Sequence, residues 1–255
     1  MKTIKYILII GLVLINFSMF SQEVETIELI GDRPDQTESA FIIPKGYFQF
    51  EDGFFFENET NEIQNLSYSS MLLRYGLFKN FELRFGTEYN STRRTGFNDI
   101  SGFSPISIGS KIHVHKENGW LPQIAFLVHI NVAETGAKEF KQDFHNTQMA
   151  MTFNHTLTDF WSVGYSLGVE FLSDADYSVG TYTVVSGLSV TEKIGVFIEA
   201  YGDFSKYTYA DNKINAGVTF LALPKLQFDV AGGIGLSENS ANNYFGVGVI
   251  YLFKI

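Results

Sequence analysis

Cysteine is absent from the 255-residue sequence. A disulfide framework and a lipid-modified N-terminal cysteine are therefore both excluded. Charged residues are also scarce, at 18%, whereas Phe (25), Tyr (13) and Gly (23) are plentiful. This composition favours β-strands over helices, and the length suits one sizeable domain or a single closed barrel.

Long hydrophobic runs are missing as well. Beyond residues 1–21 no run of about 18 apolar residues occurs, so that part of the sequence offers no membrane-spanning helix. Positively charged residues are also fewer than negatively charged ones. Removing residues 1–21 takes away two lysines and no acids, which leaves 16 Lys+Arg against 28 Asp+Glu and a net charge of −12. Such an acidic protein is not expected to bind nucleic acid.

The N-terminus has the features of a secretory signal peptide. Lys2 and Lys5 precede an apolar run from Tyr6 to Phe17, and a cleavage region follows at 18–22. The alternative, an uncleaved membrane anchor, would need a longer run and a stop-transfer segment behind it. We therefore predict that residues 1–21 are a cleaved signal peptide. An exported chain of this composition is either a soluble β-sandwich or an outer-membrane barrel.

From residue 45 onward, stretches with a period of two recur to the end of the chain, and this period is typical of strands. In the third stretch, for example, Leu83 and Phe85 alternate with Glu82, Arg84 and Glu88. The sequence predicts twelve strands: Gly46–Glu57, Leu66–Leu77, Phe81–Tyr89, Pro105–His115, Gln123–Val132, Thr147–Leu157, Phe160–Phe171, Ser178–Val190, Lys193–Asp203, Lys213–Leu221, Lys225–Leu236 and Asn243–Ile255.

The connections between these stretches distinguish a barrel from a sandwich. Short turns such as 78–80 and 158–159 alternate with longer polar connections such as 90–104 and 133–146. This alternation is typical of outer-membrane barrels, which have tight periplasmic turns and longer outer loops. Aromatic residues also gather beside the short turns and the chain end, where a membrane-interface girdle is expected: Phe78, Phe81, Trp120, Phe160, Trp161, Tyr251 and Phe253.

We therefore predict an all-β fold, a 12-stranded antiparallel outer-membrane β-barrel spanning residues 45–255, with both termini in the periplasm. The strand Asn243–Ile255 would close it against Gly46–Glu57, because an unpaired edge must be covered. One conflict arises at Asp52, which the alternation turns towards lipid. A bulge at Asp52 and Gly53 would shift the alternation there.

The polar faces of the strands would then line the lumen. Charged side chains inside a narrow wall need partners or water. They allow two interpretations: a salt-bridged filling that only stabilises the barrel, or a charged constriction that selects small solutes. The candidate lumen residues are Glu51, Arg74, Glu82, Arg84, Glu88, Lys111, His113, His129, Glu170, Glu199 and Asp229.

Residues 22–44 do not alternate and form a polar N-terminal segment at the periplasmic entrance. Such a segment could be a mobile leader, or it could tuck into the lumen as a plug. Pro34 and the turn-forming residues around it favour the tucked form. Asp32, Arg33, Asp35 and Glu38 are then the candidates that pair with lumen charges.

Motifs for catalysis or metal binding are weak. His113 and His115 share a face, but without a nearby Cys or carboxylate set we interpret them as lumen polarity. His155 has no Ser partner placed by spacing, and no Gly-rich phosphate loop occurs. We therefore expect no enzymatic activity, no metal and no cofactor.

Several motifs resemble one family of bacterial outer-membrane proteins, labelled for the meta-pathway of phenol degradation or simply as transporters. They are 32–39 (DRPDQTES), 44–53 (PKGYFQFEDG), 74–77 with 82–84, 108–111, and 224–235. The resemblance covers about residues 30–255 and implies an outer-membrane barrel with a transport role. The signal ending in Phe-Ser-Gln is similar to those of Gram-negative Bacteroidetes. Ile255 departs from the usual aromatic C-terminus of such barrels.

The sequence thus predicts a passive channel or transporter for a small, apolar or aromatic molecule. The alternative is a closed structural or interaction barrel that acts through its extracellular loops without transport. The expected partners are outer-membrane lipid, the barrel assembly machinery and a small-molecule solute.

Overall fold

The computed structural model describes residues 28–172 and 177–254. The predicted signal peptide, 1–21, the first part of the predicted N-terminal segment, 22–27, and the final residue, Ile255, lie outside the described residues. The strands are β1 (Tyr47–Asn58), β2 (Ile63–Phe78), β3 (Phe81–Arg94), β4 (Ile100–Phe103), β5 (Ile106–His115), β6 (Gln123–Val132), β7 (Asn146–Thr158), β8 (Trp161–Phe171), β9 (Ser178–Ser189), β10 (Ile194–Phe204), β11 (Asn212–Leu223), β12 (Leu226–Gly235) and β13 (Asn243–Lys254).

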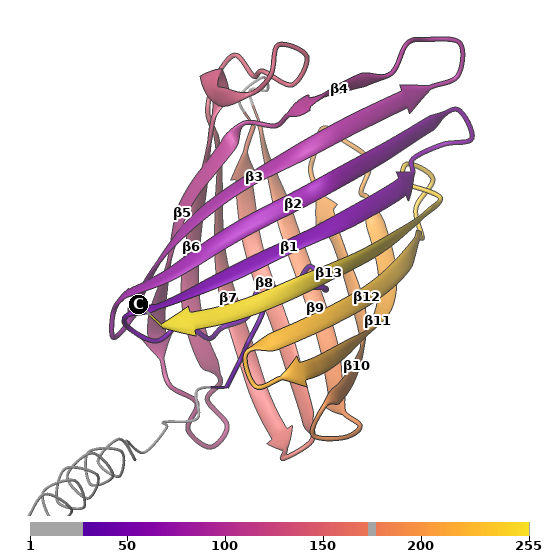
Figure 1. The fold of residues 1–255 in the computed structure, drawn as a ribbon. Coiled ribbons are helices and arrows are strands. Elements are labelled where there is room, and N and C mark those ends of the chain that lie inside the picture. The colour runs from indigo at the N-terminus through magenta and orange to yellow at the C-terminus, as the bar shows by residue number, and fades with distance from the viewer. Residues whose placement is uncertain (1–27, 173–176, 255) are drawn as a thin grey trace, which may run out of the picture.

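All of these strands belong to one antiparallel sheet that closes on itself (Figure 1). The closing pair is β1 with β13, in unbroken register from Tyr47 opposite Lys254 to Asn58 opposite Asn243. β4 pairs only with the outer end of β3 and is not one of the strands that form the barrel wall. The predicted closed barrel of twelve strands, with the last strand sealed against the first, is confirmed.

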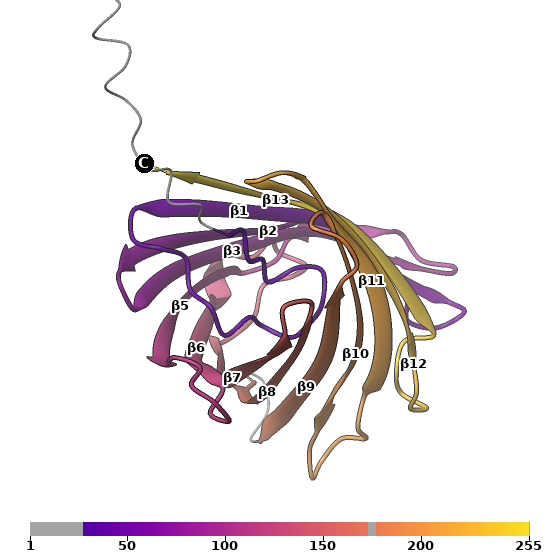
Figure 2. The same cartoon turned by 90° about the horizontal axis from the view of Figure 1, so that it is seen from below.

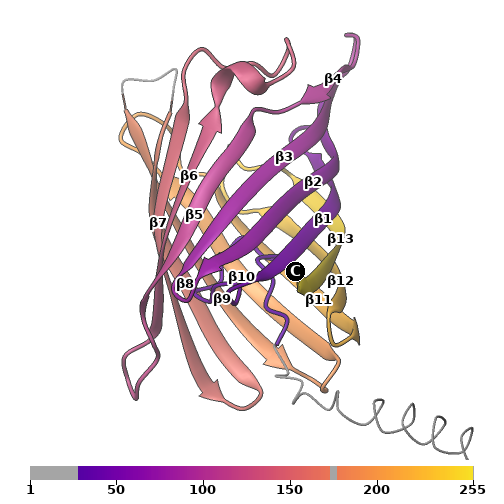
Figure 3. The same ribbon diagram turned by 60° about the vertical axis from the view of Figure 1, so that its left-hand side comes forward.

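The alternation of short and long connections is also present, with two differences. The outer connection between β1 and β2 is only residues 59–62, because both strands run further than predicted. The expected loop 90–104 contains the end of β3 and the whole of β4, which form a ribbon that projects beyond the barrel (Figure 3). Both differences arise because hairpin pairing continues past the rim of the sheet.

The two faces of the sheet have opposite chemistry. The outward side chains include many large apolar residues that are at least one-third exposed, such as Phe85, Ile108 and Val230. The buried side chains are largely polar or charged, and Arg74, Lys111, Glu51 and Glu82 are each 0% exposed. A wall with an apolar outside and a polar inside is the reverse of a soluble sandwich. Among the described residues, no helix is long and apolar enough to cross a membrane.

The bulge proposed at Asp52 and Gly53 is not in β1. Alternation is continuous along β1, and the register shifts place the extra residue in β2, at Tyr68 and Ser69. Asp52 therefore keeps its outward direction. Its carboxylate accepts a hydrogen bond of 2.8 Å from Ser69 Oγ, which the bulge brings to the same face. The bulge thus supplies a partner for Asp52 and does not turn it inward.

The N-terminal segment, residues 28–44, crosses the inside of the barrel near its periplasmic end (Figure 2). Ile43 lies in a small buried apolar cluster with Tyr47 and Leu252, and Leu29 packs against it. This cluster fixes both ends of the segment beside the β1–β13 seam. Between those ends the chain turns through the lumen, where its polar groups meet the wall.

Candidate functional site

Seven charged residues form a network between the segment and the wall, here called the Asp32 cluster: Asp32, Glu38, Glu51, Arg74, Glu82, Arg84 and Lys111. Adjacent strands deliver the wall residues, because β2 and β3 pair Arg74 with Arg84, and β3 and β5 pair Glu82 with Lys111. Arg74 Nε donates to Glu82 Oε1 at 2.8 Å, and Arg74 Nη1 donates to Glu51 Oε1 at 3.0 Å. The two arginines that face each other are thus held by carboxylates on both sides.

Asp32 completes this network from the segment. Its Oδ2 lies 2.6 Å from Arg84 Nη1, 3.1 Å from Arg74 Nη1 and 2.9 Å from Lys111 Nζ. Burial on its own raises the pKa of Asp32, but Arg74, Lys111 and Arg84 outweigh burial and hold that pKa well below its ordinary value. Asp32 is therefore ionised, and its charge docks the segment.

Backbone groups of the segment are satisfied by the same wall residues. The Asp32 N–H donates to Glu51 Oε2 at 3.1 Å, and the Ile43 N–H donates to Glu82 Oε2 at 2.8 Å. Lys111 Nζ donates to the Ser39 carbonyl at 2.9 Å. A segment without regular structure can stay inside the barrel only if such groups find partners, and the charged wall provides them.

Arg33 is a second anchor, on the strands β1, β13 and β12 that adjoin the Asp32 cluster. Its Nη2 lies 3.0 Å from Asp229 Oδ1. The guanidinium lies over Gly53 and Gly248, where any added Cβ would collide with it. These two glycines face each other across the closing β1–β13 pair. Arg33 therefore rests on the seam of the barrel.

The third anchor is Glu199 on β10. It accepts the Gln36 N–H at 2.9 Å and the Thr37 hydroxyl at 2.6 Å, and the hydroxyl oxygens of Thr37 and Thr183 lie 2.8 Å apart. Asp35 lies beside Glu199 but forms no ion pair among the described residues. Burial raises the pKa of Asp35 above its ordinary value, and the Glu199 carboxylate raises it further.

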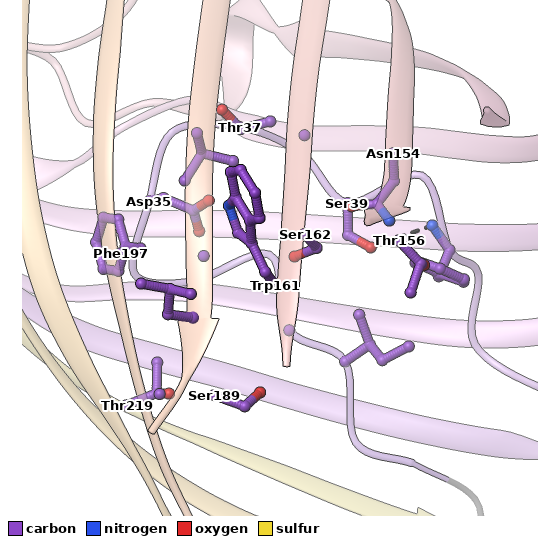
Figure 4. Close-up of a pocket in the computed structure, with 18 of the residues that line it drawn as sticks. Asp35, Thr37, Ser39, Asn154, Thr156, Trp161, Ser162, Ser189, Phe197 and Thr219 are labelled. Carbon is purple, nitrogen blue, oxygen red and sulfur yellow. Dashed lines mark hydrogen bonds between the residues drawn. The ribbon is translucent and has the colours of Figure 1, made fainter. Parts of the chain in front are cut away.

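The segment divides the lumen into two cavities. The lower cavity, about 500 Å³, extends towards the periplasmic turns and is lined by residues such as Ser162, Ser189 and Phe197 (Figure 4). The upper cavity, about 470 Å³, extends towards the outer loops and is lined by residues such as Phe55, Glu88 and Tyr244. Residues of the segment that line both cavities are Arg33, Pro34, Asp35 and Glu38.

The remaining predicted lumen residues lie apart from the segment's anchors or at their edge. Glu88 accepts a hydrogen bond from Ser70 at 3.0 Å beside the upper cavity. His129 Nε2 lies 2.8 Å from Arg84 Nε and borders the Asp32 cluster. Glu170 is on β8, opposite Gln148 of β7, and His113 is near the periplasmic end of β5, opposite Ala125.

Sequence reasoning missed several residues of this site. Gln49 is fully buried, and its side-chain amide donates to Glu51 and to the Ile30 carbonyl. Thr37 and Thr183 join the Glu199 anchor. Phe197 is an aromatic residue at an inward position, and the alternation that points Glu199 inward also predicts this direction. Its neighbours along the inward face, Gly195 and Glu199, are small or polar. An aromatic residue between them is the sequence feature that marks Phe197 as part of the lumen lining.

The histidines do not form a catalytic or metal constellation in the part of the chain that is described. His155 Nε2 lies 3.4 Å from Tyr165 Oη and the two rings stack. His145 Nδ1 accepts the Ala133 N–H at 3.1 Å in an outer loop. No group of three or more His, Cys, Asp or Glu side chains among the described residues could hold a metal ion.

The apolar outer wall, the closed even-stranded sheet and the charged lumen define the outer-membrane class of β-barrel. The family described as "Putative MetA-pathway of phenol degradation" matches residues 31–253. The chain belongs to this family, as its sequence motifs predict. The match includes the N-terminal segment from Gly31 onward, so the part of the chain that occupies the lumen lies within the family's own boundaries.

The fold is shared with solved structures, among them one outer-membrane channel and two porins. An outer-membrane channel from Pseudomonas putida F1 aligns with a TM-score of 0.70 at 13% identity, over 86% of this chain and 99% of that one. The KdgM porin, solved with oligogalacturonate, gives 0.57 at 11% identity over 80% and 99%. The NanC porin gives 0.53 at 9% identity over 80% and 98%. Comparison with curated protein sequences gives no significant match.

Proposed function

We propose that this protein is a passive outer-membrane channel for small molecules, in which the N-terminal segment sets the width of the path. The observation that carries this proposal is the pair of cavities that meet at the segment, with four of its residues lining both. A solute that crosses the lumen must pass these residues. Membership of a family of outer-membrane barrels and the shared fold of channels and porins support the same function.

The chemistry of the cavity walls supports a small aromatic or amphipathic solute over a large hydrophilic one. Phe55, Phe140 and Tyr244 line the upper cavity, and Phe197 lines the lower one. Each cavity has the volume of a site for one small molecule. The segment leaves no wide aqueous bore of the kind that large porins have.

A closed structural barrel that acts through its outer loops is the competing function. Deletion of residues 32–38 discriminates the two, because it removes the Asp32, Arg33 and Glu199 anchors together. We expect the deletion to raise single-channel conductance in planar bilayers severalfold, and to speed swelling of reconstituted vesicles in small solutes. If neither the intact protein nor the deletion variant passes ions or solutes, the transport function is wrong.

Export and membrane partners belong to the same proposal. We infer that residues 1–21 are cleaved during export, that the barrel assembly machinery inserts the chain, and that the apolar outer wall contacts outer-membrane lipid. Transport here requires no chemical reaction, and we assign none. Mass spectrometry of the outer-membrane fraction tests this directly, since the mature protein should begin near Gln22.

A further inference from the structure

The cationic side chains that face the N-terminal segment all form ion pairs with carboxylates. Arg74, Arg84 and Lys111 share the acids of the Asp32 cluster. Arg33 is paired with Asp229 and held flat over the β1–β13 seam. Buried ion pairs of this kind have little net field left to attract an anion. The middle of the lumen therefore offers no free positive charge among the described residues.

Asp35, in contrast to these paired cations, is a carboxylate without a cationic partner among the described residues. It lines both cavities, and no described arginine or lysine forms an ion pair with it. The charged groups that act on it most strongly after burial are Glu199, Asp32 and Glu38, all of them acids. A positive charge placed beside Asp35 would offset its burial and the repulsion from these acids. The geometry leaves this position for a cation that the protein itself does not supply.

The lower cavity has room for such a cation with an organic body. Its wall carries glycines at inward positions of three neighbouring strands: Gly164 on β8, Gly187 on β9 and Gly195 on β10. Its lining also includes the hydroxyl groups of Thr37, Ser162 and Thr219 and the ring of Phe197. Arg33 is the single cationic residue among the described residues that line it, and its charge is taken by Asp229.

We propose that the lower cavity binds small organic cations, such as aromatic amines, with the ammonium group paired with Asp35 and the apolar body against Phe197. A carboxylate supplies charge pairing, and an aromatic ring attracts cations through its negative face. This rests on the proposed function, because solutes reach the cavity through the lumen. Beyond that function, the proposed site specifies that the ligand is positively charged and that Asp35 and Phe197 select it.

Three probes of similar size test the proposal: benzylamine, which is cationic at neutral pH, benzyl alcohol, which is neutral, and benzoate, which is anionic. Binding to the purified full-length barrel is measured by calorimetry or ligand-detected NMR. We expect benzylammonium to bind at least about tenfold more tightly than either of the others. Asp35→Asn should remove most of this difference, and Phe197→Ala should weaken benzylammonium binding several-fold.

Glu62→Gln is the matched control, because it makes the same change of charge on an exposed outer connection, and it should leave binding unchanged. Gly187→Leu is an independent variant that fills the cavity. A Cβ at Gly187 would meet only Ser162 Oγ, at 3.5 Å, so this change should abolish binding without disturbing the sheet. Gly187→Leu therefore keeps the test decisive if Asp35→Asn does not fold.

Equal binding of the three probes, or unchanged binding in Asp35→Asn or Gly187→Leu, would overturn the proposal. Its failure is separable from that of the transport function, since binding is measured without flux. Benzylammonium binding to a barrel that conducts nothing would leave the cation site standing and remove the channel. Conductance without a preference for benzylammonium would leave the channel function standing and remove the cation site.

Discussion

At the scale of the residue, the lumen is a set of charges that depend on one another. Arg74 is fully buried and contacts three carboxylates, those of Asp32, Glu51 and Glu82. No single one of these pairs would offset the cost of burying the guanidinium, because desolvation of an ion costs several kcal/mol. The network as a whole offsets this cost. Removal of one member is therefore expected to weaken the contribution of the others to stability.

Replacing Arg74 tests this dependence. Arg74→Met keeps much of the side-chain volume but leaves Glu51 and Glu82 buried without their main cation. We expect a loss of about 3–5 kcal/mol in the free energy of unfolding, measured by urea titration of the barrel in lipid vesicles. Arg93→Met is the control. Its ion pair with Asp99 is about half exposed, so it should cost about 0–1 kcal/mol, and equal losses would contradict the idea of a shared network.

Some of this site could be predicted residue by residue. Alternation along β2 and β3 directs Arg74, Glu82 and Arg84 inward, and a hairpin necessarily makes them neighbours. The contacts of Asp32 could not be found this way. Its partner Lys111 is 79 positions away, and an irregular segment has no period from which to infer direction. Hydrogen bonds from backbone amides, such as those of Gln36 and Ile43, carry no side-chain signal at all.

At the scale of the element, the N-terminal segment behaves as one unit held by three anchors. The Asp32 anchor should be insensitive to mild acid, because the pKa of Asp32 lies well below its ordinary value of 3.8. A carboxyl whose pKa is lowered by docking contributes its full stabilisation above the ordinary pKa, and loses it only as the pH falls through the lowered pKa.

Conductance measured against pH checks this expectation. The intact channel should keep the contribution of Asp32, and a narrow conductance state, down to about pH 4. Asp32→Asn should conduct more already at pH 7, because it removes the negative charge that Arg74, Arg84 and Lys111 share. A steep opening of the intact channel between about pH 6 and 5 would show that another acid controls docking.

The strands themselves were the most predictable elements, since one face meets an apolar surrounding and the other a polar lumen. Their ends were less predictable. β3 continues to Arg94 and pairs with β4 beyond the wall, where no change of environment marks a boundary. The sequence predicts a bulge on β1, at Asp52 and Gly53, whereas the bulge lies on β2, at Tyr68 and Ser69. A single misfit at Asp52 does not reveal which of the two paired strands carries the extra residue.

At the scale of the whole molecule, the barrel has two unlike rims. The expected orientation places the ribbon formed by β3 and β4, together with residues 133–145, outside the cell. Protease added to intact cells should therefore cut within 95–99 or 133–145 and spare the turn at 116–122, with the fragments identified by mass spectrometry. Cleavage at 116–122 in intact cells, with the other two sites protected, would reverse the topology.

Arg33 has a consequence for how the molecule is made. Its support consists of Gly53 from the first strand, Gly248 from the last and Asp229 from the one before it, so this binding place does not exist until the two ends of the sheet have met. The segment is synthesised before every strand, yet this anchor can form only after the final one is in position. Formation of the Arg33 anchor is therefore a mark of completed closure, and a barrel that stalls unclosed would lack this anchor.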